Sequence, residues 1–419
     1  MPNTNSESAL ATLRINKQRL WDSLMGLASI GATPKGGVCR IALTDLDRQG
    51  RDFFVKQARQ AGCSIRVDAV GNIFARRSGQ NNDLPVVMTG SHIDTQPTGG
   101  KFDGNYGVLA GLEVMQTLND AGIVTQAPLE VAVWTNEEGS RFVPVMMGSG
   151  AFVREFTTDY VLGQTDKEGV TVGQALTQIG YAGADQIDPK HIAAYFEAHI
   201  EQGPVLEANE TTIGVVLGAL GQRWYDIVVT GMEAHAGPTP MALRKDALLA
   251  AAALVQTVND SAMRYAPHAR GTVGMMDVYP NSRNVIPGHV SMSVDFRADN
   301  DKTLLDMDAE LRAAANALSQ SHRVSIEVKQ VVYFPPQAFA PKLVDAIRKG
   351  ARALDLSEMD IVSGAGHDAV YLARVAPTAM IFIPCKDGIS HNEIEDALPE
   401  HIEAGCNVLL QAMLNTACI

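Results

Sequence analysis

The sequence predicts an α/β fold: an open, mixed β-sheet with helices on both faces, interrupted by a smaller inserted α+β domain. Helical periodicity alternates with short apolar runs that are typical of buried strands. Three of these runs, 84–88, 129–134 and 194–198, each end beside polar residues, as strands that deliver a binding site do. Residues 224–332 read strand, helix, strand, strand, helix, strand, which is the ferredoxin-like order.

The large domain is expected to hold helices on both sides of the insertion. Besides the three strands, the patterns predict a strand at 379–383 and helices at 11–28, 44–61, 104–118, 341–354, 368–374 and 399–414. The insertion is expected to hold strands 224–230, 271–279, 289–298 and 324–332 and helices 246–264 and 302–319. We therefore divide the chain into 1–218 and 333–419 for the large domain and 219–332 for the inserted one.

Bulk properties exclude several classes of protein. At 419 residues the chain is longer than one ordinary core, and no apolar run approaches the roughly 18 residues that a membrane span needs. The N-terminus has no secretory signal, and the five scattered cysteines form no C-x-x-C pair, so we expect reduced thiols in the cytoplasm. A net charge of −13 disfavours nucleic acid as a partner, but it permits a small anionic substrate beside bound metal ions.

Ligand-type side chains follow the predicted strands. His92 alone reads as a loop histidine, Asp103 as a helix N-cap, and Glu137 with Glu138 as a solvated turn. However, two carboxylates next to a buried strand are costly unless a positive group compensates them. Together these residues predict a pair of divalent metal ions with a carboxylate base beside them, and so an enzyme. Asp94 is the candidate carboxylate for orienting a metal-bound His92 through its other ring nitrogen.

Two more histidines extend this set. His199 ends the third apolar run, and His391 lies in the loop after the last predicted strand. The chain has no H-E-x-x-H motif and no thiolate cluster, so the ligands are nitrogen and oxygen atoms. Such ligands suit zinc, manganese, cobalt or nickel, and the sequence does not choose among them.

The inserted domain supplies candidate substrate contacts. His235 suits a hydrogen bond to a developing oxyanion, and Arg297 suits a substrate carboxylate through its two-pronged guanidinium group. Asn284 lies 13 residues before Arg297 in the sequence. The simpler interpretation of Arg297 is a surface salt bridge with Asp295 or Asp299, which composition alone does not remove.

Six motifs carry a family resemblance: Gly90-Ser91-His92-Ile93-Asp94, Gly99-Gly100-Lys101-Phe102-Asp103-Gly104, Glu137-Glu138-Gly139-Ser140-Arg141-Phe142, His199-Ile200-Glu201-Gln202-Gly203-Pro204, His235-Ala236-Gly237 and Asn284-Val285-Ile286-Pro287. Their order resembles the M20-type metal-dependent hydrolases, and most closely the amidase branch. That branch contains N-carbamoyl-L-amino-acid hydrolases, β-ureidopropionases and allantoate amidohydrolases. The resemblance extends from Gly90 to His391.

The resemblance implies a metallo-exopeptidase-like large domain and an inserted domain that serves as lid and homodimer contact. It implies two divalent metal ions per subunit, held by His92, Asp103, Glu138, His199 and His391, with Asp103 bridging them. It also implies Glu137 as general base and then acid. His235, Asn284 and Arg297 are implied as substrate contacts, with Gln202 and segment 364–368 as further candidates. Whether His235 acts within its own chain or across the dimer stays open.

The activity that follows is metal-dependent hydrolysis of the carbamoyl C–N bond of N-carbamoyl-L-amino acids, giving the L-amino acid, carbon dioxide and ammonia. N-carbamoyl-β-alanine and allantoate are alternative substrates, because both carry a ureido group and a carboxylate. A metallo-exopeptidase and a non-catalytic binding protein of the same fold are more distant alternatives. The native metal and the side chain and chirality of the substrate stay open at this point.

Overall fold

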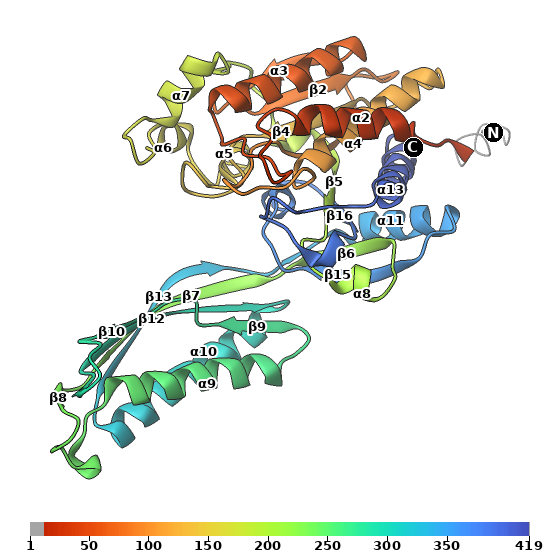
Figure 1. Ribbon diagram of the computed structural model, residues 1–419. Coiled ribbons are helices and arrows are strands. Elements are labelled where there is room, and N and C mark those ends of the chain that lie inside the picture. The colour runs from red at the N-terminus through yellow and green to blue at the C-terminus, as the bar shows by residue number, and fades with distance from the viewer. Residues whose placement is uncertain (1–11, 419) are drawn as a thin grey trace. The chain divides into compact units, whose positions relative to one another are not determined.

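The chain is described here by a computed structural model in which residues 12–418 are placed (Figure 1). It divides into two compact units, Met1–Gly218 with Phe339–Ile419, and Ala219–Ala338. The smaller unit starts where the sequence-based boundary lies. It ends at Ala338 rather than at residue 332, because strand β13 (Ser325–Phe334) runs past the expected end and is followed by β14 (Gln337–Ala338), which pairs in the nine-stranded sheet described next.

A nine-stranded mixed sheet forms the centre of the larger unit. Its order is β1-β2-β4-β3-β5-β16-β6-β14, with β15 also paired to β6. The strands are β1 Ser64–Val67, β2 Ile73–Arg77, β3 Val86–His92, β4 Leu129–Trp134, β5 Ile192–Ile200, β6 Ile213–Ala219, β14 Gln337–Ala338, β15 Glu358–Ser363 and β16 Thr378–Ile383. The four neighbours β4, β3, β5 and β16 are parallel, whereas β2 and β6 flank them antiparallel. This confirms the predicted mixed sheet.

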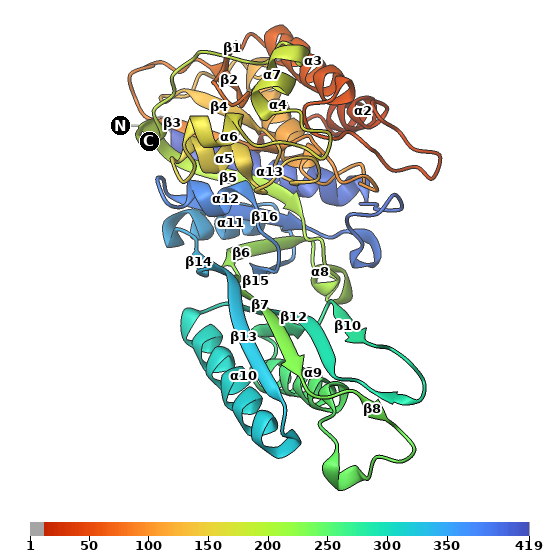
Figure 2. The same cartoon turned by 90° about the vertical axis from the view of Figure 1, so that its left-hand side faces the viewer.

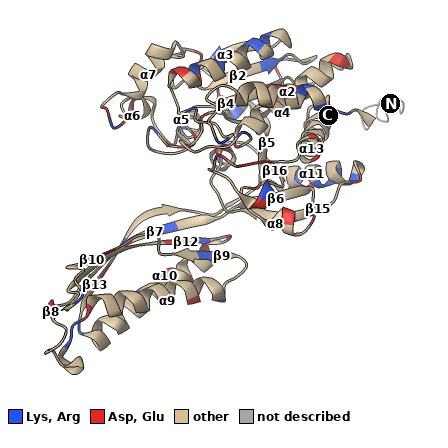
Figure 3. Cartoon of the chain, viewed as in Figure 1, with Lys and Arg blue, Asp and Glu red and all other residues tan. Residues whose placement is uncertain are grey.

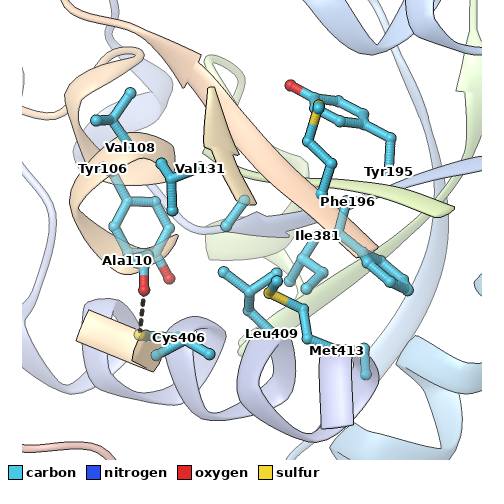
Figure 4. Packing of buried hydrophobic residues seen from close by; sticks show 14 of the residues in the cluster. Tyr106, Val108, Ala110, Val131, Tyr195, Phe196, Ile381, Cys406, Leu409 and Met413 are labelled. Carbon is cyan, nitrogen blue, oxygen red and sulfur yellow. Dashed lines mark hydrogen bonds between the residues drawn. The ribbon is translucent and has the colours of Figure 1, made fainter. Parts of the chain in front are cut away.

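Helices cover both faces of this sheet. Side chains of a strand alternate between faces. In β5, Phe196 packs near Met413 of α13 (Figure 4), while the next residue, Glu197, accepts a hydrogen bond from Ala369 N of α12 at 2.9 Å. The helices of this unit are α2 Lys17–Ala28, α3 Asp45–Gln60, α4 Asn105–Asp120, α5 Met147–Phe152, α6 Thr158–Leu162, α7 Val172–Ile179, α8 Val205–Ala208, α11 Pro341–Ala353, α12 Asp368–Leu372 and α13 Pro399–Ala417, with short 3₁₀ turns at Pro189–His191 and Lys386–Gly388.

Two central strands are longer than the sequence predicts. β3 continues through Thr-Gly-Ser to His92, and β5 includes His199, so these histidines end strands rather than lie in loops. The polar residues of β3 read as a loop in isolation, yet all seven residues of the strand are buried because both faces are covered. The strands β1, β2, β6 and β15 are not among the predicted elements. β1 and β15 are short or only partly buried, so their apolar pattern is weak, whereas β6 is mostly buried and the prediction missed its apolar run.

The smaller unit has the predicted ferredoxin-like arrangement. Its antiparallel sheet has the order β10-β12-β7-β13, and α9 and α10 lie side by side against it (Figures 1 and 2). Its elements are β7 Gly221–Thr230, β8 Ala234–His235, a 3₁₀ turn at Met241–Leu243, α9 Ala247–Arg264, β9 Ala269–Thr272, β10 Met276–Tyr279, β11 Val285–Ile286, β12 His289–Ala298, α10 Asp301–His322 and β13. The strand expected at 271–279 is two strands, β9 and β10, which pair with different halves of β12.

Local signals set several element boundaries. Asn16 caps α2 through its side chain, so this helix starts later than the predicted 11–28; residue 11 itself lies outside the described residues. Asp246 and Asn300 cap α9 and α10 in the same way. β12 alternates buried and half-buried residues along its whole length, which is the pattern of a sheet covered by helices on one face.

The charged residues, the cysteines and the long helices of the described chain do not point to a particular partner. Acidic and basic residues are dispersed over the helices and strands of both units (Figure 3). All five cysteines are free thiols. Within residues 12–418, no helix combines the length and the apolar character that crossing a membrane requires.

The packing of α4 against β5 leads to a stability prediction. A Cβ added at Gly107 in α4 would lie 2.5 Å from the backbone oxygen of Ala198 in β5. Gly107→Ala should therefore destabilise the fold by roughly 1–3 kcal/mol, seen as a lower urea midpoint. Gly173→Ala in α7 is the matched control, because its Cβ meets nothing closer than 3.4 Å. The control should leave stability unchanged or raise it by up to about 1 kcal/mol, and equal midpoints for the two variants would contradict the prediction.

Candidate metal centre

The carboxyl ends of the four parallel strands carry most of the candidate ligands. His92 ends β3, Glu137 and Glu138 follow β4, His199 lies near the end of β5, and His391 comes after β16. Because the four strands are parallel neighbours, these ends lie along one edge of the sheet. Tertiary structure thereby gathers residues that are up to about 300 positions apart in the chain.

Asp103 joins the ligands into two groups of three. His92, Asp103 and His199 form one group, and Asp103, Glu138 and His391 form the other. Asp103 Oδ1 lies 3.5 Å from His92 Nε2 and 3.3 Å from His199 Nε2. Its other oxygen, Oδ2, lies 3.4 Å from His391 Nε2, which is 3.3 Å from Glu138 Oε2. The first group is fully buried, whereas the side chain of His391 is 50% exposed.

These separations suit ligands of shared metal ions. Bonds of about 2.1 Å in a tetrahedral site place ligand atoms about 3.4 Å apart, close to all four separations in the two groups. The rings of His92 and His199 are also oriented for this role, because Nδ1 of each lies 2.9 Å from a backbone oxygen, that of Asp94 and Ile200 respectively. Nδ1 then carries the proton, and the lone pair of Nε2 in each ring faces the cluster. In this structure the Nε2 of His199 also accepts the Gly104 N–H at 3.2 Å. The donor set therefore fits divalent metal ions with nitrogen and oxygen ligands.

The Asp94 carboxylate has a different partner from the one expected. It lies 4.0 Å from His92 Nδ1, and the backbone oxygen of Asp94 takes the contact with the ring instead. Its two oxygens accept the backbone N–H groups of Glu137 and Glu138, each at 3.2 Å. Asp94 thus holds the glutamate pair in place, and it orients His92 only through its main chain. The sequence suggested that the Asp94 carboxylate orients His92. It did not show that the Asp94 backbone oxygen contacts the ring while the carboxylate binds the backbone of Glu137 and Glu138.

Glu137 lies beside the first group of ligands rather than within it. Its Oε2 is 3.6 Å from His92 Nε2, and its side chain is 11% exposed. Its backbone is held from both sides, by the Asp94 carboxylate and by the Met146 N–H, which donates to Glu137 O at 2.7 Å. Burial raises the pKa of Glu137 well above its usual value. A carboxylate with a high pKa and a fixed backbone suits reversible proton transfer near neutral pH.

Charge in the cluster is strongly coupled. Burial, followed by the negative charge of Asp103, raises the pKa of Glu138 to about 8. Burial opposes protonation of His92, but the charge of Glu137 and the contact with Asp103 outweigh it, so the pKa of His92 lies well above its usual value. Although burial also opposes ionisation of Asp103, hydrogen bonds from His199 and His92 hold its pKa well below the usual range. The cluster therefore binds protons where it lacks other cations.

Several residues around the ligands were not singled out from the sequence. Gln96 donates to Glu138 Oε2 at 2.8 Å, and its backbone N–H donates to Oε1 at 3.2 Å. Ser390 donates to Asp103 Oδ2 at 2.7 Å, and Glu395 accepts the Asp103 N–H at 3.1 Å. Ser390 directly precedes His391, which was a usable signal, whereas nothing in the sequence relates Glu395 to residue 103.

Gln202, a candidate substrate contact, contacts the candidate metal ligand Asp103 in this structure. Its side-chain amide donates to Asp103 Oδ2 at 2.8 Å, and its backbone has a φ of 58° in the left-handed region. The expected alternative for Asp103, a helix N-cap, does not occur: the N-cap of α4 is Gly104, with no side-chain hydrogen bond. The Asp103 carboxylate is therefore directed at the ligand cluster.

A third group of possible ligands, Glu197, His199 and His367, is already satisfied by other partners. Glu197 accepts hydrogen bonds from Ser91 Oγ at 2.7 Å and from Ala369 N at 2.9 Å. Both ring nitrogens of His199 face the groups described above. The His367 ring, from the segment 364–368, meets the His199 ring edge-on with centroids 4.5 Å apart. Glu197 and His367 therefore pack around His199 and are not free to bind a further metal ion.

The candidate substrate contacts of the smaller unit fall into two places. His235 in β8 pairs with Val285 in β11, and Ala236 N donates to Asn284 O at 2.8 Å, so His235 and Asn284 are neighbours. Arg297 lies near the far end of β12. Its Nε and Nη2 lie 3.1 Å and 3.0 Å from Asp295 Oδ2, which is the salt bridge that the sequence offered as the simpler interpretation.

Comparison with known proteins confirms the family resemblance. Residues 88–415 match the peptidase family M20/M25/M40. The chain is 47% identical to an N-carbamoyl-L-amino-acid amidohydrolase from Rhizobium meliloti, over 96% of this chain and 97% of that protein. It is 36% identical to the Geobacillus stearothermophilus N-carbamoyl-L-amino acid amidohydrolase, over 96% and 99% respectively. A crystal structure of a hydantoinase/carbamoylase family amidase from Burkholderia multivorans has 56% identity and a TM-score of 0.95, and covers 97% of this chain and 99% of that one.

The raised pKa values of two candidate ligands predict how the affinity of the cluster for metal ions depends on pH. Metal ions displace protons from their ligands, and Glu138, with a pKa of about 8, and His92, with a raised pKa, both bind protons as the pH falls. Apparent Zn²⁺ affinity should therefore fall at least about tenfold between about pH 8 and pH 6. Competition with a chromophoric chelator, corrected for the chelator's own titration, measures this change. An affinity that is constant over this range would contradict the proton competition.

Proposed function

The chain belongs to peptidase family M20/M25/M40, and on this premise we propose that it hydrolyses the carbamoyl C–N bond of N-carbamoyl-L-amino acids. The products are the L-amino acid, carbon dioxide and ammonia. One observation carries the proposal: two groups of ligands share Asp103, with the Glu137 carboxylate beside them. Relatives that are similar over nearly their whole length and are named for this activity support the substrate class.

Two divalent metal ions fit the cluster. His92, Asp103 and His199 would hold one, and Asp103, Glu138 and His391 the other, with Asp103 shared. Zinc, manganese, cobalt and nickel all accept these nitrogen and oxygen ligands. When bound, such ions polarise a carbonyl group and lower the pKa of water. This supply of positive charge also accounts for carboxylates that are otherwise costly to bury.

Glu137 is the proposed proton carrier. It takes a proton from the attacking water and gives one to the departing amine, so the same carboxylate acts first as base and then as acid. Burial raises the pKa of Glu137 and so favours its protonated form, whereas positive charge from bound metal ions would favour its ionised form. The Asp94 carboxylate and the Met146 N–H fix the backbone of Glu137, which limits the positions that its carboxylate can take.

Three residues of the smaller unit are the proposed substrate contacts. Arg297 binds the substrate carboxylate, Asn284 assists, and His235 donates a hydrogen bond to the developing oxyanion. To do so, Arg297 exchanges its partner Asp295 for the substrate; both side chains are about 30% exposed, so the exchange is open to solvent.

The spacing within the smaller unit favours a homodimer. The segment from Asn284 leads directly into His289 at the start of β12, whereas Arg297 is near its other end. At roughly 3.3 Å per residue, the strand from His289 to Arg297 spans about 26 Å, far more than a small ureido acid. We therefore assign Arg297 of one subunit and the partner's His235 to the same substrate. Exposed apolar side chains near the His235 end, such as Met241 and Leu243 at 72% and 61% exposure, are suited to a subunit contact.

A substrate panel tests the activity. Release of ammonia is measured with N-carbamoyl-L-methionine, its D-enantiomer, N-carbamoyl-β-alanine and allantoate, each with added Zn²⁺, Mn²⁺, Co²⁺ or Ni²⁺. We expect the highest kcat/KM for the L-enantiomer and loss of activity with a chelator. Preference for N-carbamoyl-β-alanine or allantoate would replace the substrate but keep the chemistry. Release of amino acids from dipeptides would identify an exopeptidase, and absence of both metal and turnover would identify a binding protein.

Replacement of the base separates catalysis from metal binding. Glu137→Gln should retain the metal content of the wild type, because Glu137 belongs to neither group of ligands, and should lose roughly 10²–10⁴-fold in kcat. Metal analysis and turnover of N-carbamoyl-L-methionine are measured on the same sample. Glu168→Gln, at an exposed carboxylate, is the control and should change neither quantity. Near-normal turnover in Glu137→Gln would remove the assigned role.

Complementation tests the shared substrate site. His235→Ala and Arg297→Ala should each be strongly impaired as separate homodimers. After subunit exchange in an equimolar mixture, half of the dimers are mixed, and each has one site with both residues intact, so activity should recover to about a quarter of wild type. Refolding each variant alone in the same way is the control. No recovery in a mixture that demonstrably contains mixed dimers would place both residues in one subunit's site.

A further inference from the structure

Glu395 links the loop that carries His391 to the loop that carries Asp103. Its side chain is buried, with the residue only 1% exposed. Glu395 Oε1 accepts the backbone N–H groups of Phe102 at 2.9 Å and of Asp103 at 3.1 Å. A Cβ at Gly100 would lie 2.0 Å from the Glu395 carboxyl carbon, so only glycine leaves space for this crossing. Two ligands from distant parts of the sequence are thereby held in register by one carboxylate.

The second carboxylate oxygen of Glu395 competes with Asp103 for the hydrogen bond that the Ser390 hydroxyl donates. Ser390 Oγ lies 2.7 Å from Asp103 Oδ2 and 3.2 Å from Glu395 Oε2. A hydroxyl group has one proton to donate, so it serves one of the two acceptors at a time. Asp103 Oδ2 is also the atom that faces His391, at 3.4 Å. The Gln202 amide also donates to this oxygen, at 2.8 Å. A metal ion held by the second group would need one of the lone pairs that the Ser390 hydroxyl and the Gln202 amide occupy here.

We propose that Glu395 is a positioning residue for Asp103, which it serves in two ways. Oε1 accepts the backbone N–H groups of the Asp103 loop and fixes that loop. Oε2 accepts the hydrogen bond of the Ser390 hydroxyl when Asp103 Oδ2 binds a metal ion instead. Only a rotation of the Ser390 hydroxyl is involved; no covalent bond forms or breaks. This inference rests on the proposed function, since it assigns Glu395 to the site formed by Asp103, Glu138 and His391.

The chemistry requires a carboxylate at this position rather than any polar side chain of the same shape. In Glu395→Gln the amide oxygen must face the two backbone N–H groups, because those donors need an acceptor. The amide NH₂ then occupies the Oε2 position and donates to Ser390 Oγ. Of the two carboxylates that face Ser390 Oγ here, only Asp103 then remains as acceptor for the Ser390 hydroxyl, and that hydrogen bond opposes metal binding. Removing the hydroxyl in the double variant Ser390→Ala/Glu395→Gln removes that obstacle.

The test compares Glu395→Gln, Ser390→Ala, the double variant and the control Glu393→Gln. Glu393 is two residues away and pairs with Lys35 at 3.2 Å, away from Asp103. Zn²⁺ affinities are measured by competition with a chromophoric chelator, and the visible absorption of the Co²⁺-loaded protein reports the ligand geometry. Melting of the metal-free protein reports the fold, so a general structural defect is seen separately from a defect in metal binding.

Glu395→Gln should bind the more weakly held Zn²⁺ about tenfold or more less tightly, with a changed Co²⁺ spectrum and nearly unchanged melting without metal. Ser390→Ala should bind Zn²⁺ at least as tightly as the wild type, and the double variant should recover the wild-type affinity. The control should match the wild type.

Three results would overturn the inference: wild-type affinity in Glu395→Gln, weakened affinity in Ser390→Ala, or no recovery in the double variant. If Glu395→Gln does not fold, the affinity of Ser390→Ala still decides. A wild-type protein that binds no pair of metal ions would instead overturn the proposed function, so the two failures are distinguishable.

Discussion

The Asp103 carboxylate lies within 3.5 Å of the Nε2 atoms of three histidines, His92, His199 and His391, and the larger unit is arranged around this convergence. Carboxylates packed this closely and largely buried need added positive charge, whether from protons or from metal ions. The parallel strands supply the geometry by bringing their carboxyl ends to one edge of the sheet. The long apolar core beneath them keeps those ends in place.

Backbone hydrogen bonds, more than side-chain pairs, hold the site together. Asp94 binds the N–H groups of Glu137 and Glu138, and Glu395 binds those of Phe102 and Asp103. Each carboxylate thus fixes a loop that carries a neighbouring functional carboxylate. Buried acidic groups in this protein have two separate tasks, to face the ligand cluster and to hold the main chain that presents it, and only contacts in three dimensions separate the two.

The smaller unit has its own core and presents its candidate substrate contacts at two separate places. Its sheet is covered by α9 and α10 and has its own apolar core, so it packs as a compact unit. Of the residues that the family resemblance assigns to substrate, Arg297 lies near the end of β12, whereas His235 and Asn284 lie beside the segment that leads into its start. In a symmetric pair of chains, one chain can supply Arg297 and the other His235 to the same substrate. The length of one strand is therefore the strongest physical argument for a homodimer.

Sequence patterns by themselves determined the fold class, the central strands of the larger unit, the ferredoxin-like order of the smaller one and the ligand-type residues at the strand ends. This worked because buried parallel strands and amphipathic helices have strong periodic signals, and because unusual polar residues such as His92, Glu137 and Glu138 stand directly beside such strands. Short strands such as β1 and β15 were not predicted, because their partial burial leaves only a weak apolar pattern in the sequence.

Only the tertiary structure decided which atoms meet. It divided the ligands into two groups that share Asp103, gave the Asp94 carboxylate to the backbone of Glu137 and Glu138 rather than to His92, and brought Glu395 against residue 103. The physical reason is that hydrogen bonds and ligand geometry depend on distances of a few tenths of an ångström, set by packing between segments hundreds of residues apart. Periodicity along a chain carries information about faces and burial, but none about such separations.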